Sequence, residues 1–79
     1  MFPKEIARIA LVAIHAAESQ TLDYLLNELL KWTDAPDPAT GEACKLVYNR
    51  LLIACSEKRL DLKRYANTLT YLARYIDNC

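Results

Sequence analysis

The chain has 79 residues, of which 53% are hydrophobic and 25% are charged, and its ten basic side chains balance ten acidic ones. This length fits one all-helical domain, residues 1–79, near the lower limit at which a chain folds alone. A formal net charge of zero argues against a general polyanion binder, because such proteins normally carry a basic excess.

Two further features bear on the cellular setting. Three cysteines in a short chain do not make a closed disulfide framework, so we expect a reduced, cytoplasmic protein. The apolar run 6–17 contains Arg8 and His15. It is too short and too interrupted to span a bilayer, so we expect no membrane partner.

The first predicted helix covers residues 3–18. Pro3 suits the first turn of a helix, where its missing N–H group costs nothing. Helical spacing then predicts which side chains form the inner face. These are Ile6, Ile9, Ala10, Ala13 and Ala17.

The second predicted helix covers residues 20–33, and its apolar stripe starts at Leu22 and ends at Leu30. At 100° per residue, this stripe is rotated by roughly 150° from the first one. One straight helix cannot bury both stripes against the same partner. We therefore expect a break near residues 19–21 with Ser19 as the N-cap. A long helix that changes partners midway is the alternative.

Residues 34–41 read DAPDPATG and hold the only glycine of the chain. Prolines, aspartates and glycine together predict a turn. Asp37 or Thr40 would cap the next helix, which we expect over residues 41–57.

An apolar stripe runs from Cys44 to Cys79 at alternating gaps of four and three residues, and only Lys58 breaks it. This phase favours one continuous helix. Asp61 is a good N-cap, however, and Leu60 and Tyr65 have the spacing of a hydrophobic staple.

We favour a turn at residues 56–61 and predict an all-α bundle of four short helices, roughly 3–18, 20–33, 41–57 and 61–77. The alternative is a long helical hairpin that dimerises into a four-helix bundle. The cysteines distinguish the two folds. Cys44 and Cys79 would approach each other in the bundle, whereas in a continuous helix they would lie about 50 Å apart. We expect the cysteines to act as small core residues.

The sequence holds no constellation that indicates a reaction. His15 is the only histidine, so any Ser, Cys or metal mechanism would have to use it. The cysteines lack a short metal-ligand spacing such as C-x-x-C, and one glycine cannot form a phosphate-binding loop. We therefore predict a non-enzymatic protein with no catalytic residue, no metal and no cofactor.

Apolar and aromatic side chains outside the main stripe predict a protein-binding surface, because tyrosine, tryptophan and arginine are enriched at interfaces. Part of this second apolar line must also cover the first helix. The candidate residues are Leu46, Ile53, Tyr71, Arg74, Tyr75 and Trp32. An adaptor, a regulator or a compact inhibitor, including one encoded by a phage or mobile element, would have this sequence pattern. The partner would be another protein or a second copy of the chain, as a homodimer.

A basic cluster supports a second hypothesis, a regulatory nucleic-acid-binding protein. The residues are Arg50, Lys58, Arg59, Lys63 and Arg64. They could contact phosphates, although Glu57 and Asp61 interrupt the cluster. Binding of this kind would fall steeply with salt.

Overall fold

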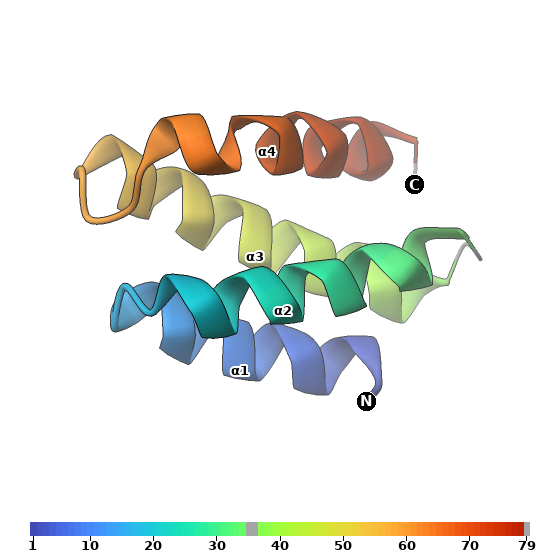
Figure 1. Ribbon diagram of the computed structural model, residues 1–79. Helices are drawn as coiled ribbons and strands as arrows, with labels where there is room; N and C mark the ends of the chain where they lie inside the picture. The colour runs from blue at the N-terminus through green and yellow to red at the C-terminus, as the bar shows by residue number, and fades with distance from the viewer. Residues whose placement is uncertain (35–36, 79) are drawn as a thin grey trace.

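The computed structural model describes residues 1–34 and 37–78, and these residues form four α-helices and one 3-10 helix. The elements are α1 (Pro3–His15), α2 (Ser19–Lys31), η1 (Trp32–Asp34), α3 (Pro38–Ser56) and α4 (Leu62–Asp77). Successive helices run in opposite directions (Figure 1). This arrangement confirms the predicted all-α bundle of four short helices, and the long helical hairpin was wrong.

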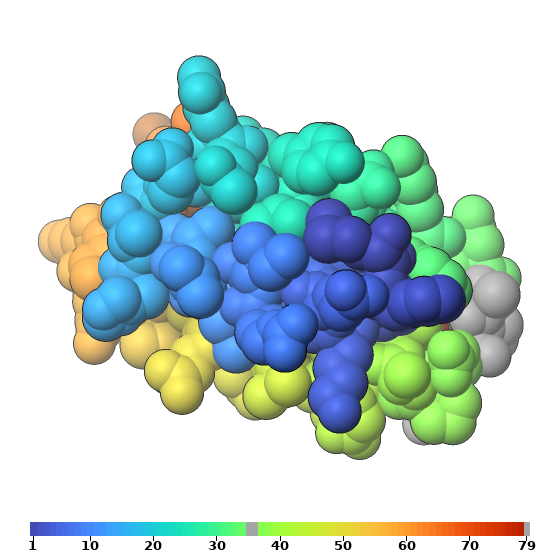
Figure 2. Space-filling model, turned by 90° about the horizontal axis from the view of Figure 1, so that it is seen from below, coloured from blue at the N-terminus to red at the C-terminus, as the bar shows by residue number. Residues whose placement is uncertain are grey.

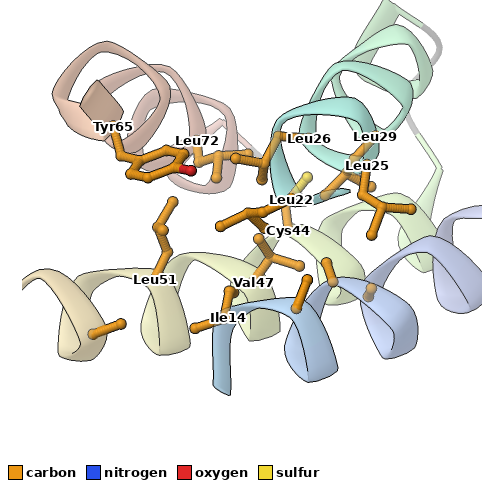
Figure 3. Packing of buried hydrophobic residues seen from close by; sticks show 14 of the residues in the cluster. Ile14, Leu22, Leu25, Leu26, Leu29, Cys44, Val47, Leu51, Tyr65 and Leu72 are labelled. Atoms are coloured by element: carbon orange, nitrogen blue, oxygen red, sulfur yellow. The ribbon is translucent and has the colours of Figure 1, made fainter. Parts of the chain in front are cut away.

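The bundle is built around α1 and α3, which lie side by side and run in the same direction (Figure 1). α1 also packs against α2, and α3 also packs against α4. Across the core, Tyr65 and Leu72 of α4 and Leu26 of α2 point toward Val47 and Leu51 of α3 (Figure 3). Side chains from all four helices therefore fill one core.

Small side chains set the spacing of the central helices. Ala7 and Ala10 of α1 and Ala43 and Ala54 of α3 are all buried. The distance between packed helices depends on the side chains at the contact, so alanines permit a close approach. α1 can thus pack against α2 and α3 at the same time.

The predicted inner face of α1 was partly wrong. Ile6, Ala10 and Ala13 are buried as expected, but Ile9 and Ala17 are exposed. Because α1 lies between two neighbours, its buried face is centred on Ala10 and is completed by two other residues. These are Ala7 and Ile14.

The predicted break between the first two helices is confirmed, but it falls at residues 16–18. Ala17 adopts a left-handed conformation with φ 54°. The N–H groups of Glu18 and Ala17 donate to the carbonyls of Ala13 and Ile14 at 2.9 and 3.1 Å, which is a Schellman ending. Ser19 is therefore not the N-cap. Glu18 holds that position, and its side chain makes no capping hydrogen bond.

α3 begins three residues earlier than predicted because Asp37, one of the two proposed caps, takes the N-cap position. Its side chain accepts a hydrogen bond from the Ala39 N–H group at 3.1 Å. Thr40, the other proposed cap, is instead buried inside the first turn of the helix. Residues 35 and 36 of the predicted turn lie outside the described residues.

α3 ends with the same geometry as α1. Lys58 is left-handed with φ 63°, and the N–H groups of Lys58 and Arg59 donate to the carbonyls of Cys55 and Ala54. Lys58 thus interrupts the apolar stripe because it lies in a turn.

The start of α4 follows the prediction. Asp61 accepts a hydrogen bond from the Lys63 N–H group at 3.1 Å, and Leu60 and Tyr65 are both buried. Leu62, however, is exposed. The alternating gaps of the predicted stripe include Leu62, and this part of the prediction was wrong, because the buried side chains of α4 begin one turn later, at Tyr65.

Cys44 and Cys55 are buried, which confirms their role as core residues. Burial raises the pKa of the Cys55 thiol. Cys79 lies outside the described residues, and with it the predicted approach of Cys44 to Cys79. Among the residues that the structure describes, no helix combines the length and the apolar character needed to cross a membrane.

We expect Lys58→Gly to stabilise the protein. Residues with a Cβ atom are strained in the left-handed region, and glycine is not. The relief of this strain is partly offset, because glycine loses more conformational entropy on folding. The expected net gain in the free energy of unfolding is about 0.5 kcal/mol. Urea unfolding measures it. The matched control is Ser56→Gly in the last turn of α3, which should lower stability by a similar amount. A loss of stability in Lys58→Gly would contradict the role assigned to its backbone.

Candidate functional site

The residues predicted for protein binding lie in two separate places. Tyr71, Arg74 and Tyr75 belong to α4, and Trp32 opens η1. Leu46 and Ile53 lie on α3, where Leu46 borders a groove shared with α1. The two groups therefore belong to two separate surfaces.

The candidate residues on α4 include side chains that fix this helix against the rest of the bundle. The Tyr71 hydroxyl lies 2.8 Å from Oγ1 of Thr33 in η1. Thr33 donates its single hydroxyl proton to the Leu30 carbonyl at 2.6 Å, so Tyr71 is the donor in the first bond. Tyr75 is partly buried against the core, whereas Arg74 is exposed. Both tyrosines thus help to hold α4 in place.

Trp32 also has a partner within the chain. Its ring lies 5.8 Å from the ring of Phe2, centroid to centroid, with the planes tilted by 48°. Such a tilted aromatic pair adds to the gain from burial. Trp32 is partly buried, so much of its ring is already used to join η1 to the start of α1.

An ion pair spans the outer side of α2 and α4. The Arg64 guanidinium donates to the Asp23 carboxylate, with Nε at 3.2 Å. This hydrogen bond holds the pKa of Asp23 below its ordinary value and raises that of Arg64. Burial raises the pKa of the neighbouring Tyr65 hydroxyl.

The predicted nucleic-acid cluster is divided by such contacts. Arg64 pairs with Asp23, and Arg59 donates to the Glu57 carboxylate at 2.9 Å and to the Ile14 carbonyl at 3.3 Å. Arg50, Lys58 and Lys63 make no ion pair within the part of the chain that the structure describes. Two of the five candidate cations are thus engaged within the fold.

A groove of about 750 Å³ lies between α1 and α3. Buried Ala7 and Ala43 line it, and their short side chains leave space that larger residues would fill. Leu11 and Leu46 line the same groove, and Leu46 remains 52% exposed. The groove is therefore open to solvent and largely apolar in its lining.

Apolar side chains continue beyond the groove on the same side of the molecule. Val12 of α1 is 67% exposed, and Ile53, two turns after Leu46 on α3, is 48% exposed. Figure 2 shows α1 crossing this side, with α3 along one edge. We call Leu11, Val12, Leu46 and Ile53, together with the groove, the α1–α3 face. Leu11 and Val12 were not among the predicted site residues. The signal that could have identified them is that both are apolar residues outside the predicted inner face of their helix.

The carboxylates that border the α1–α3 face have partners within the fold, whereas several of the cations make no ion pair among the described residues. Glu5 accepts a hydrogen bond from the Phe2 N–H group at 3.3 Å, and Glu42 lies 3.8 Å from Lys45. Three cations make no ion pair among the described residues. They are Lys4, Arg8 and Arg50. Arg50 shares this side of α3 because it follows Leu46 by four residues.

Nothing in the described residues points to a metal centre, since no group of three or more His, Cys, Asp or Glu side chains could hold an ion there. No family model matches the chain, and no curated protein and no solved structure matches it either.

The Asp23–Arg64 pair predicts a pH-dependent coupling. The pKa of Asp23 is lowered in the folded state, so the pair stabilises the protein above the ordinary pKa of an aspartate. This contribution is lost as the pH falls through the lowered pKa. A double-mutant cycle with Asp23→Asn and Arg64→Gln should give a small favourable coupling at neutral pH, because the pair is partly exposed and screened.

The cycle is measured by urea unfolding at neutral and at acidic pH. We expect the coupling to disappear at the acidic end. A coupling that persists with Asp23 protonated would contradict the ionic nature of this contact.

Proposed function

We propose that this chain is a small protein-binding module that acts through the α1–α3 face. The observation that carries the proposal is the exposure of Leu46 and Ile53, 52% and 48%, beside an open groove of about 750 Å³. Exposed apolar side chains beside a groove are typical of interaction sites on soluble proteins. The face is formed by two helices that are fixed in the core, so it is preorganised for binding.

The residues best placed to contact a partner differ from those that composition alone suggests. Tyr71 is hydrogen-bonded to Thr33, and Trp32 forms a tilted aromatic pair with Phe2, so binding through either ring would compete with contacts inside the fold. Leu46 and Ile53 have no such role. We therefore assign the main anchoring role to Leu46 and Ile53, with Arg74 and the exposed part of Tyr71 on a separate surface.

A module of this kind acts by occupying a partner's surface. It would serve as an adaptor, a regulator or an inhibitor, and these roles share the same requirement for a rigid apolar patch. The protein itself would contribute no chemical step, so its effect on a partner would depend on affinity and position alone.

Leu46→Glu should abolish binding without unfolding the protein. Leu46 is half exposed, so a carboxylate there stays hydrated in the free protein but loses its water in a complex. The matched control is Tyr24→Glu on α2, where the native side chain is 59% exposed. Both variants should keep the helical circular dichroism and thermal midpoint of the wild type.

The three proteins are immobilised and exposed to an extract of the native host. We expect a protein retained by wild type and by Tyr24→Glu to be lost with Leu46→Glu, and calorimetry should then show at least a tenfold increase in its Kd. Retention that is equal on all three columns, or absent from all, would refute the proposed role of the α1–α3 face.

The nucleic-acid hypothesis remains an alternative proposal, carried by the exposed cations Arg50, Lys58 and Lys63. It requires affinity for duplex or single-stranded nucleic acid that falls steeply as salt is raised. We expect no measurable binding at physiological salt, in a fluorescence anisotropy titration of wild type and of Lys58→Ala/Lys63→Ala. Binding by wild type that the double substitution removes would favour this alternative over ours.

A further inference from the structure

We propose that the α1–α3 face binds an amphipathic helix of another protein, with acidic residues beside the apolar stripe of that helix. The inference rests on the proposed function and names the class of its partner. It is carried by the shape of the groove, by the spacing of its apolar side chains and by its unpaired cations.

The shape of the site favours a helix. The groove lies between two neighbouring helices that run in the same direction, and amphipathic helices dock into such grooves through one apolar face. Within residues 1–34 and 37–78 there is no β-strand, so this part of the chain offers no sheet edge to which an extended peptide could add. A helix satisfies its own backbone hydrogen bonds and needs no such edge.

The spacing of the anchors fits a helix as well. Leu46 and Ile53 are seven residues apart on one side of α3, about 10 Å along its axis. Two apolar residues seven apart on a docking helix have the same separation. The span from Ala39 at one end of the groove to Ile53 is about 21 Å, which a helix of about 14 residues covers.

The charges select an acidic partner. Lys4 and Arg8 line the groove and Arg50 adjoins it, and all three lack an ion pair among the described residues. Of the two carboxylates at the groove, Glu42 lies 3.8 Å from Lys45, whereas Glu5 accepts only from the Phe2 N–H group and keeps its charge. With Lys45 and Arg50 counted, the cations around the groove still outnumber these carboxylates. Opposite charges across an interface favour encounter and suppress wrong partners.

The same charges argue against a second copy of this chain as the occupant. Two copies that met through their α1–α3 faces would bring the cationic excess of both faces into one interface. Like charges placed together in an interface oppose association. An apolar helix with acidic flanks meets no such opposition.

The experiment selects binders from a displayed library of helical peptides. Each peptide has about 16 residues, with apolar residues at helical spacing and the flanking positions randomised. Selection uses wild-type protein, and peptides that also bind Leu46→Glu are removed. We expect the selected peptides to be richer in aspartate and glutamate than the starting library.

The role of the cations is tested with the double variant Arg8→Glu/Arg50→Glu. For a selected acidic peptide we expect its Kd to rise about tenfold or more, since two charge contacts become repulsive. The matched control is Lys63→Glu/Arg74→Glu, which changes the net charge equally on exposed positions of α4 and should leave the Kd nearly unchanged. An equal rise in both variants would show a general charge effect and overturn the inference.

The remaining outcomes separate this inference from the proposed function. Selected peptides that depend on Leu46 but carry no acidic excess would overturn the acidic partner and leave the α1–α3 face as a binding site. A library without any Leu46-dependent binder would overturn the inference of a helical partner. The proposed function is decided separately, by the retention of host proteins on the immobilised wild type and variants. A dimer in sedimentation experiments that Leu46→Glu dissociates would replace the acidic helix with a second copy.

Discussion

The close approach of α1 to its two neighbours is the constraint on which the rest of the structure depends. Ala7, Ala10 and Ala43 are buried where these helices meet. Short side chains allow the backbones to approach, but they also leave the outer side of the contact unfilled. Leu11 packs only partly against the core and Leu46 stays exposed, and both border that space. The packing that stabilises the bundle and the groove that we propose as its binding site therefore have one origin.

The opposite side of the bundle is closed by different means. α4 meets α2 and η1 through polar side chains, with Arg64 on Asp23 of α2 and Tyr71 on Thr33 of η1. These polar contacts add to the burial of Tyr65, Leu69 and Leu72 in fixing the position of α4, and each is partly open to solvent. The aromatic residues that composition associates with interfaces thus serve within the fold, and simple aliphatic residues are left on the surface.

Local signals explain how much of the fold could be predicted. Asp61 and the pair Leu60 and Tyr65 mark the start of α4 within six residues, and that prediction is confirmed. The ends of α1 and α3 carry no such signal, because Ala17 and Lys58 occupy left-handed positions where glycine is usual. The apolar stripe also keeps its phase across the second turn, so periodicity alone could not separate α3 from α4.

The candidate site was harder to predict because its parts are distant in the sequence. Tyr71 meets Thr33 from 38 residues away, and no local pattern shows that its hydroxyl has a partner. The groove needs Ala7 and Ala43 at the same height on two different helices, which only the packed structure reveals. Leu46 and Ile53 were identified from their spacing, while their neighbours on α1 were not.

Arg59 joins the two turns at one end of the bundle. It belongs to the turn after α3, yet its guanidinium donates to the Ile14 carbonyl near the end of α1. A positive charge at the C-terminus of a helix is also favourable for its dipole. Local opening of either turn breaks this shared contact between the guanidinium and the carbonyl. The contact therefore couples the stabilities of the two turns, although 45 residues separate the bonded groups.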